Sequence, residues 1–327
     1  MNGHGEAKRP PAARHPGPTG APPASPVRLT SPVTREETGE LRRLLARAAA
    51  GEYQVIQAGG DGTEAPAAVA RRTGLLDALA GIMRANTGRP VVRIDGVAGP
   101  EFRERPTGAA VWTSHEALVL DHEPHLLRDT PTARPLLAST HLPWLGDRTG
   151  RPDGPTARLL ARIANPLACE VGPRTTATVL LRLCRVLDPD REPGRLTLVS
   201  RMGVSHVGSA LPRLVTAVRR AGYPAAWLCD PMGGNTFTAR SGHRTQLVSM
   251  VIEEVVAFQR AVVEAGGVAA GLRLETTPDA VTECAWGLAD VDRVTERPAS
   301  PCGPRLSPAQ AFTVAGAWGA PPPTAAG

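Results

Sequence analysis

Short apolar segments that end in a charged or polar residue recur along this sequence, and they constrain the fold more than any other feature. Three of the clearest end at Arg201, Asp230 and Glu275. A strand covered on both faces has this form, because polar side chains are tolerated only where it reaches the rim of a parallel sheet or barrel. Segments of helical periodicity separate these strands, which begin about every thirty residues. The pattern predicts repeated parallel β/α units.

The number of these units favours one architecture within the α/β class. We predict strands at residues 53–58, 91–94, 109–113, 142–145, 167–171, 196–200, 225–229 and 272–275, and helices at 34–51, 67–85, 177–187, 207–221, 246–264 and 308–317. Residues 130–135 are predicted to be a loop. This alternation favours a (β/α)8 TIM-type barrel, and an open doubly wound sheet is the alternative.

The two ends of the chain differ from its middle. Residues 1–33 are rich in Pro, Ala and Gly and lack an apolar core, so we expect a disordered leader rather than an export signal. Residues 34–318 are expected to form the barrel, and residues 319–327 a flexible tail. The apolar runs are too short for a membrane-spanning helix, so we expect no membrane partner. Five cysteines without a CxxC pair indicate reduced thiols, and we expect a cytoplasmic location.

The charged residues exclude several kinds of chemistry. The net charge is +6, but the arginines are scattered and aromatic residues are few, so we expect no nucleic-acid partner. Lys8 is the only lysine. The predicted barrel therefore cannot form a lysine Schiff base, and it cannot contain a lysine-bearing phosphate loop.

Polar side chains at the ends of barrel strands should face one common mouth. The expected set is Asp61, Asp95, Asp147, Arg148, Glu170, Arg201, Asp230 and Glu275. Arginines among carboxylates favour a phosphate or carboxylate ligand. We therefore expect the partner to be a small anionic or phosphorylated metabolite.

Several sequence blocks resemble one known family. They are SHEALVLD at 114–121, GDRT at 146–149, GRLTLVSRMG at 194–203, CDPMGGNT at 229–236, VTEC at 281–284 and CGPRL at 302–306. In this order they resemble the class II 3-deoxy-7-phosphoheptulonate (DAHP) synthases over about residues 53–317. The resemblance implies a (β/α)8 barrel and a transferase that condenses phosphoenolpyruvate with erythrose 4-phosphate, in the shikimate pathway of aromatic amino acid biosynthesis. It also implies a divalent metal such as manganese or cobalt, held by Cys, His, Glu and Asp.

The resemblance does not extend to most of the family's metal ligands. The family's metal cysteine, histidine and aspartate correspond to Gly62, Gly233 and Gly303, and Glu275 is the only ligand position retained. One carboxylate cannot hold a catalytic divalent ion, which normally takes about three protein ligands. The sequence therefore predicts a divergent member that has lost most of its metal ligands and needs no cofactor.

The substrate positions are also partly changed. The family's phosphate-binding lysine corresponds to Glu170, and its strand-two arginine corresponds to Gly96. We expect catalytic roles for Glu275, Asp230 and Asp147, and substrate-binding roles for Arg201, Arg148 and Trp144. A segment present in the family is missing before Ser114, which shortens the barrel and leaves its closure open.

Three functions remain open at this stage. The first is a DAHP synthase-type condensation in which the aldehyde is activated by a metal, or by Arg201 and Arg148 in its place. The second is a barrel enzyme of specialised metabolism that acts on an anionic substrate without metal. The third is a non-catalytic paralogue that binds a metabolite or a partner, either a second copy of itself or a full-length synthase.

Structural alternatives exist for several of these residues. Asp230 could cap the turn before Pro231, and Glu275 could form a salt bridge at the barrel rim. Arg201 could be buried against a carboxylate such as Glu170. His115 with Glu116 is predicted to be a structural pair rather than a catalytic one.

Overall fold

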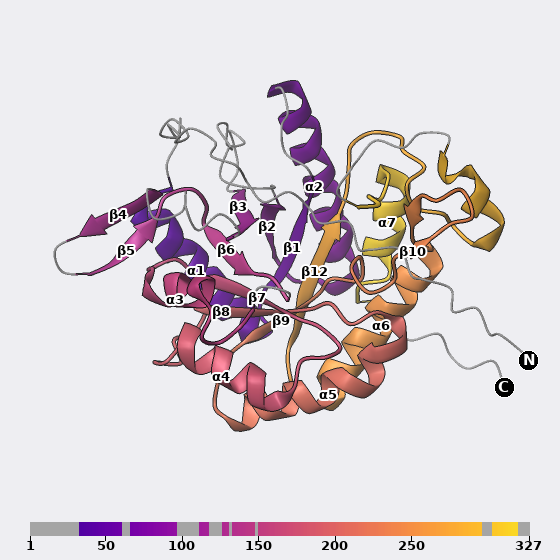
Figure 1. Cartoon of the computed structure of the whole chain (residues 1–327). Helices are drawn as coiled ribbons and strands as arrows, with labels where there is room; N and C mark the ends of the chain where they lie inside the picture. The colour runs from indigo at the N-terminus through magenta and orange to yellow at the C-terminus, as the bar shows by residue number, and fades with distance from the viewer. Residues whose placement is uncertain are drawn as a thin grey trace, which may run out of the picture.

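A closed parallel barrel forms the centre of the molecule (Figure 1). The computed structural model describes residues 33–60, 66–96, 111–117, 126–130, 133–147, 150–295 and 303–319. In the order in which they pair, the barrel strands are β1 (Gln54–Gly59), β12 (Ala269–Glu275), β9 (Ala226–Cys229), β8 (Leu196–Ser200), β7 (Leu167–Val171), β6 (Leu142–Leu145), β3 (Trp112–Glu116) and β2 (Val91–Gly96). The predicted (β/α)8 barrel is confirmed.

The segment missing before Ser114 does not open the barrel. Strand β2 pairs directly with β3, and Ile94 lies opposite Trp112 in this parallel ladder. Strand β1 pairs with β2 on one side and with β12 on the other, so the ring closes between the first and last strands. The question that the sequence left open is therefore answered by a complete ring of hydrogen-bonded strands.

Helices alternate with the strands along the chain. They are α1 (Arg35–Ala49), α2 (Pro66–Thr87), α3 (Pro155–Arg162), α4 (Ala177–Leu187), α5 (Val204–Arg220), α6 (Val248–Glu264) and α7 (Pro308–Gly316), with a 3-10 helix η2 (Leu288–Thr295). Helices α3, α4, α5 and α6 pack side by side, and α7 lies against both α6 and α2 (Figure 1). Their apolar stripes cover the outward-facing side chains of the strands and form the main core.

Helix α1 closes the N-terminal end of the barrel. A capping box starts it, in which Thr34 Oγ1 accepts from the Glu37 amide at 3.2 Å and Glu37 Oε2 accepts from the Thr34 amide at 2.8 Å. Its buried Leu41 and Leu45 join the first inward-facing side chains of the strands, such as Val55, in a second core cluster. This apolar plug leaves the opposite end, where the strands finish, as the open mouth.

The loop predicted at residues 130–135 is wrong. Strands β4 (Leu127–Thr130) and β5 (Ala133–Leu137) form an antiparallel hairpin between β3 and β6. The hairpin is stabilised because Leu126 and Leu137 are buried, although the segment between them is polar and contains Pro135. A second short hairpin, β10 (Phe237–Thr238) with β11 (Arg244–Thr245), and helix α3 were also not predicted.

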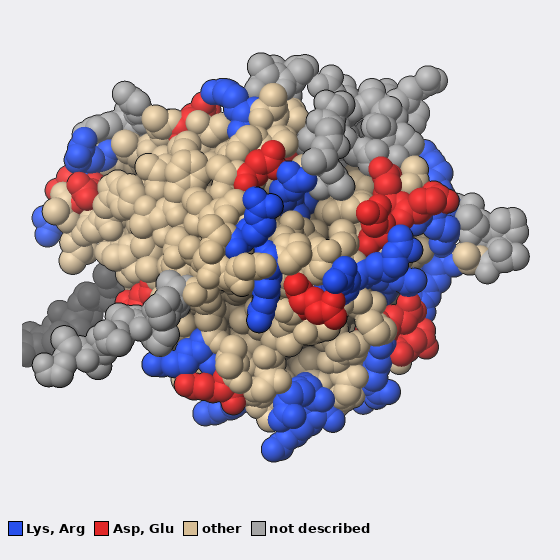
Figure 2. All heavy atoms as spheres, turned by 180° about the vertical axis from the view of Figure 1, so that it is seen from behind, with Lys and Arg blue, Asp and Glu red and all other residues tan. Residues whose placement is uncertain are grey.

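The chain ends, the length of the helices and the surface charge were also predicted from the sequence. Most of the expected leader (residues 1–33) and tail (residues 319–327) lies outside the described residues. Val33 at the end of the leader is buried, and the backbone N–H of Gly319 donates to Gln259 Oε1 at 2.8 Å. In the described part of the chain, no helix combines the length and apolar character needed to cross a bilayer. On the face shown in Figure 2, arginines alternate with Asp and Glu rather than forming one continuous basic surface.

A glycine at the start of β8 provides a test of the fold. Gly194 has φ +76°, and a Cβ placed there would overlap the Arg42 carbonyl oxygen of α1. We expect Gly194→Ala to lower the free energy of unfolding by about 1–3 kcal/mol, because both the backbone and the contact with α1 are strained. Urea unfolding followed by circular dichroism measures the change.

The matched control is Gly208→Ala in the exposed interior of α5, where a Cβ would meet nothing within 4 Å. This change should raise stability by up to about 1 kcal/mol, because alanine has the higher helix propensity. Equal effects of the two substitutions would contradict the packing of α1 described above.

Candidate active site

Charged side chains from four neighbouring strands meet at the open mouth. Glu170 lies on β7, Arg201 and Asp230 directly follow β8 and β9, and Arg273 and Glu275 lie on β12. These five side chains are called the arginine–carboxylate cluster. Four of them belong to the set expected at strand ends, whereas Arg273 was not predicted. Its spacing could have predicted this location, since Arg273 lies two residues before Glu275 and therefore on the same face of the strand.

Arg273 is held on several sides. Its Nη1 donates to Glu170 Oε1 at 2.8 Å, and its Nε lies 3.9 Å from Asp230 Oδ2. The guanidinium carbon lies 3.8 Å from the centre of the Trp144 ring, in cation–π geometry. The side chain is only 11% exposed. Trp144, predicted to bind substrate, therefore contacts the cluster through Arg273.

Arg201 shares the same two carboxylates but holds them more loosely. Its Nη1 lies 3.5 Å from each Glu170 oxygen, and its Nε lies 3.7 Å from Asp230 Oδ2. The charge of Asp230 raises the pKa of Arg201, and Glu170 adds to the effect, so this guanidinium stays charged. Its side chain is 33% exposed. The long contacts leave guanidinium donors that an anionic ligand can use.

Glu170 is the carboxylate around which both arginines gather. Burial alone would raise its pKa, but Arg273, Arg201 and the Asp147 backbone N–H hold the pKa below its ordinary value. That N–H donates to Glu170 Oε2 at 3.0 Å. Glu170 is therefore ionised, and its charge is used to hold two guanidiniums. The repulsion of a phosphate that a lysine-to-glutamate change would cause in isolation is reduced by this pairing.

Asp230 has two roles, one for each oxygen. Oδ1 accepts from the Met232 amide at 3.0 Å, which is the turn cap considered from the sequence. Oδ2 faces Arg201 and Arg273 at 3.7 and 3.9 Å. The turn thus fixes the carboxylate that orients both arginines.

Glu275 faces the arginines without an ion pair within 4 Å among the described residues. Burial raises its pKa to about 7, and Asp230 adds to this, while Arg201 and Arg273 oppose it. No hydrogen bond joins its carboxylate to another described residue. The rim salt bridge considered for Glu275 is therefore absent from the described contacts, and the group can take up and release a proton near neutral pH.

The loops that carry Arg201 and Asp230 touch backbone to backbone. Gly203 has φ +79°, and a Cβ there would lie 2.8 Å from the Gly234 carbonyl oxygen. A Cβ at Gly234 would overlap the Gly203 amide nitrogen. Only glycine permits this approach on both sides. The contact fixes the distance between Arg201 and Asp230.

A buried carboxylate on α6 joins these two loops from below. Glu254 accepts from the Gly203 amide at 2.9 Å and from Asn235 Nδ2 at 2.6 Å. Asn235 Oδ1 in turn accepts from the Val204 amide at 3.0 Å. Burial raises the pKa of Glu254 to about 7, although both hydrogen bonds lower it. Glu254 was not predicted, although a charged residue beside Val251 and Val255 on the apolar stripe of a helix was a usable signal.

Not every predicted mouth residue reaches the cluster. Asp95 points outward from β2 and pairs with Arg72 of α2, with Arg72 Nε 2.9 Å from Asp95 Oδ1. Asp147 contributes its backbone N–H to Glu170, while the residue itself is exposed. Arg148 and Asp61 lie outside the described residues.

His115 forms structural contacts, in line with the structural pair predicted for it. One ring nitrogen lies 3.0 Å from the Glu116 carbonyl oxygen and the other lies 3.0 Å from Ser139 Oγ. The ring is buried, which lowers its pKa to about 4. Four cysteines, Cys169, Cys184, Cys229 and Cys284, are buried and form no disulfide, whereas Cys302 lies outside the described residues.

The resemblance places Gly62, Gly233 and Gly303 at metal-ligand positions, and Gly62 lies outside the described residues. The two that are described, Gly233 and Gly303, offer no side-chain ligand to a divalent ion. A Cβ at Gly233 would overlap Arg201 Nε, so the arginine runs where a histidine side chain would begin. A Cβ at Gly303 would lie 3.1 Å from Glu275 Oε2. Within the described ranges, no group of three or more His, Cys, Asp or Glu side chains could hold a metal ion.

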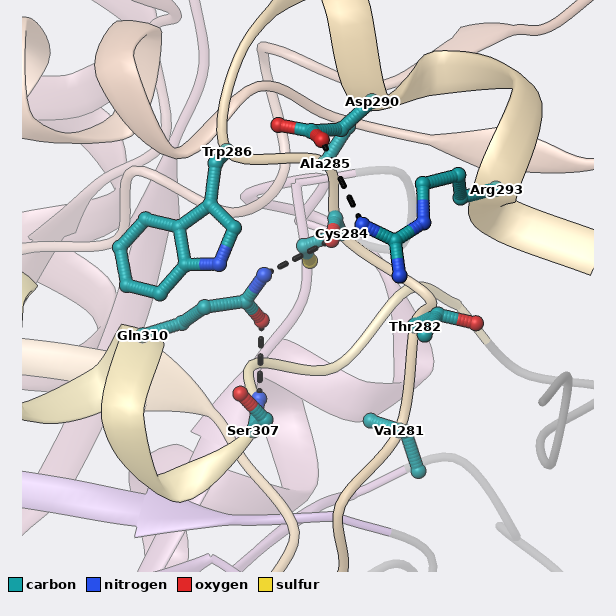
Figure 3. Close-up of a pocket in the computed structure, with 9 residues that line it drawn as sticks. All are labelled: Val281, Thr282, Cys284, Ala285, Trp286, Asp290, Arg293, Ser307 and Gln310. Atoms are coloured by element: carbon teal, nitrogen blue, oxygen red, sulfur yellow. Dashed lines mark hydrogen bonds and ion pairs between the residues drawn. The ribbon is translucent and has the colours of Figure 1, made fainter. Parts of the chain in front are cut away.

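A separate pocket of about 150 Å³ lies between the loop after β12, η2 and the start of α7 (Figure 3). Trp286 forms one wall and is 46% exposed. Gln310 crosses the base, where its Nε2 donates to the Cys284 carbonyl oxygen at 2.8 Å and its Oε1 accepts from the Ser307 amide at 3.0 Å. No residue of the arginine–carboxylate cluster lines this pocket.

Comparison with known proteins gives a consistent result. The sequence profile of the Class-II DAHP synthetase family matches residues 101–318. A "Probable phospho-2-dehydro-3-deoxyheptonate aldolase" of Pseudomonas fluorescens is 42% identical over 348 residues, covering 86% of this chain and 87% of that protein. A "Phospho-2-dehydro-3-deoxyheptonate aldolase" of Streptomyces coelicolor is 41% identical over 207 residues, covering 62% of this chain but only 46% of that protein.

A solved structure supports the fold. The phospho-2-dehydro-3-deoxyheptonate aldolase of Francisella tularensis has a TM-score of 0.57 at 10% sequence identity, covering 87% of this chain and 90% of that one. At this identity the likeness concerns the fold alone. The closed barrel with a charged mouth defines a TIM-barrel protein. The profile match and the 42% identity further show that the chain belongs to the class-II DAHP synthetase family.

The buried Glu254 gives a pH-dependent prediction. Its pKa is about 7 in the folded protein and ordinarily 4.5, so between these values the folded state binds a proton that the unfolded state does not. This contribution to stability is complete below about pH 4.5 and is lost as the pH rises to about 7, at no more than about 1.4 kcal/mol per pH unit. Glu254→Gln should remove this slope.

The measurement is the free energy of unfolding from urea titrations at several pH values, compared between wild type and variant. The difference between the wild-type and variant curves isolates the contribution of Glu254. His115, with its lowered pKa, changes stability with pH in the opposite direction, but it does so equally in both proteins. Parallel curves for the two proteins would contradict the assignment.

Proposed function

We propose that this chain catalyses the DAHP synthase reaction, in which phosphoenolpyruvate condenses with erythrose 4-phosphate at the barrel mouth. Membership of the family supports this proposal over a metabolite-binding paralogue or an enzyme of specialised metabolism. The observation that carries it is the placement of Arg201. This side chain matches the family pattern, is one-third exposed at the mouth, and keeps hydrogen-bond donors that two fixed carboxylates leave unused.

The proposed chemistry is balanced within the two substrates and one water molecule. The methylene carbon of phosphoenolpyruvate forms a bond to the aldehyde carbon, and the aldehyde oxygen takes up a proton. Water adds through its oxygen to the carbon that carries the phosphate. The proton that this water loses replaces the proton taken up by the aldehyde oxygen. Loss of inorganic phosphate then gives the ketone product.

The residues divide these tasks. Arg201, together with Arg148, binds the anionic groups of the substrates. The ring of Trp144 positions Arg273 through the cation–π contact. Glu275 gives a proton to the aldehyde oxygen and regains one from the water, because its carboxylate faces the arginines without a hydrogen-bond partner among the described residues.

The two aspartates complete the mouth. Asp230 orients Arg201 and Arg273, since one of its oxygens is fixed by the turn and the other faces both guanidiniums. Asp147 presents its exposed carboxylate beside the N–H that fixes Glu170, and we propose that it contacts the aldehyde substrate.

Phosphate release from the two substrates together tests the reaction. We expect release from phosphoenolpyruvate only when erythrose 4-phosphate is present, and we expect Glu275→Gln to lower kcat by about 100-fold or more because the proton transfer is lost. The Kd for phosphoenolpyruvate, measured by calorimetry, should change little in this variant.

Release that does not depend on erythrose 4-phosphate would indicate a phosphatase. No release from the pair of substrates, with or without manganese, would contradict the proposed reaction. A Glu275→Gln variant with wild-type kcat would contradict the role given to Glu275 alone.

A further inference from the structure

An arginine side chain crosses the space beside Gly233, the position that the resemblance assigns to a metal-binding histidine. A Cβ at Gly233 would overlap Nε of Arg201 and would lie 2.5 and 2.6 Å from its Cγ and Cδ. The stem of Arg201 therefore passes through the volume where a histidine side chain would start. Glycine is the only residue that leaves this path open. The loss of the histidine position and the course of Arg201 are thus one structural feature.

A second guanidinium lies beside the first. Arg273 and Arg201 contact the same oxygen of Glu170, at 2.8 and 3.5 Å. Both also face the same oxygen of Asp230, at 3.9 and 3.7 Å. Two cations can lie this close because both carboxylates are shared between them. Together the pair carries the same formal charge as a divalent ion.

The remaining ligand position faces this pair. Glu275 lies two residues after Arg273 on β12, so both side chains point to the inner face of the barrel. A guanidinium differs from a metal ion because it offers several N–H donors in a planar fork, which suits carboxylates and phosphates. Donors fixed in advance also stabilise negative charge that develops on a carbonyl oxygen.

We propose that Arg201 and Arg273 together take the place of the divalent cation and form an oxyanion site at the barrel mouth. The site binds a carboxylate, or a carbonyl oxygen on which negative charge develops, through the N–H groups that Glu170 and Asp230 leave unused. That phosphoenolpyruvate is the natural ligand of this site rests on the proposed function. Binding at this site needs no divalent metal.

Calorimetric binding of phosphoenolpyruvate to the full chain tests this proposal without requiring turnover. The protein is first treated with a chelator, and the titration is then repeated with manganese added. We expect the same Kd in both conditions. Titrations with pyruvate and with inorganic phosphate separate recognition of the carboxylate from recognition of the phosphate, and we expect competition by pyruvate.

Three variants test the pair itself. Arg201→Gln and Arg273→Gln each remove one charge, and Gly233→Ala leaves both charges in place but displaces Arg201. Each should weaken phosphoenolpyruvate binding about tenfold or more, because a charge-assisted hydrogen bond is lost or misplaced. Gly208→Ala, on the exposed face of α5, controls for a glycine-to-alanine change and should keep the wild-type Kd. Circular dichroism identifies any variant that fails to fold. The variants that fold then test whether the arginine pair binds phosphoenolpyruvate.

The outcomes separate this proposal from the proposed function. Metal-independent binding that both arginine variants weaken supports the pair even if no condensation occurs. Binding that requires manganese overturns the pair, whether or not the protein then makes product. Absence of binding for phosphoenolpyruvate, pyruvate and phosphate in both conditions also overturns it.

Discussion

The mouth of this barrel depends on one buried carboxylate, that of Glu170. It accepts from Arg273 at 2.8 Å, faces Arg201 at 3.5 Å, and takes the backbone N–H of Asp147 at 3.0 Å. A buried charge without such partners would destabilise the fold by several kcal/mol, about 3–5 by comparison with broken buried pairs. The pairing therefore works in both directions, since the arginines keep Glu170 ionised and Glu170 keeps both arginines at the mouth. The resemblance in sequence places a phosphate-binding lysine of the family at this position. In this chain Glu170 instead holds two arginines.

Glycines set the positions of the cluster as strongly as charges do. Gly203 and Gly234 allow the two loops that carry Arg201 and Asp230 to touch, and Glu254 accepts hydrogen bonds from both loops. Gly233 leaves the path that the stem of Arg201 follows. A side chain at any of these glycines would overlap a neighbouring atom and so displace the charged groups of the cluster. The absence of a side chain at Gly233 is thus physically linked to the course of Arg201.

The sequence predicted the barrel and much of its mouth, for reasons that can be located in particular residues. Arg201, Asp230 and Glu275 were found because each ends an apolar run, and parallel strands bring such ends together. Asp95 has the same signal but lies on the outer face, and its partner Arg72 is on a helix whose rotation no local pattern reveals. Arg273 was missed because it interrupts an apolar run near its end, although its two-residue spacing from Glu275 places both inside the barrel. The β4–β5 hairpin was missed because its polar, proline-containing segment is stabilised by burial of leucines at its ends, which is a tertiary effect.

Two guanidiniums, those of Arg201 and Arg273, are proposed to take the place of the metal ion that the family resemblance implies. The most direct measurement is the electron paramagnetic resonance signal of free aqueous manganese, recorded as purified protein is added in the presence of phosphoenolpyruvate. A parallel titration without protein corrects for manganese bound by phosphoenolpyruvate itself. We predict that the signal of free manganese stays unchanged up to equimolar protein, because Arg201 fills the space beside Gly233 where a side-chain ligand would start. Loss of one equivalent of free manganese for each chain would contradict it.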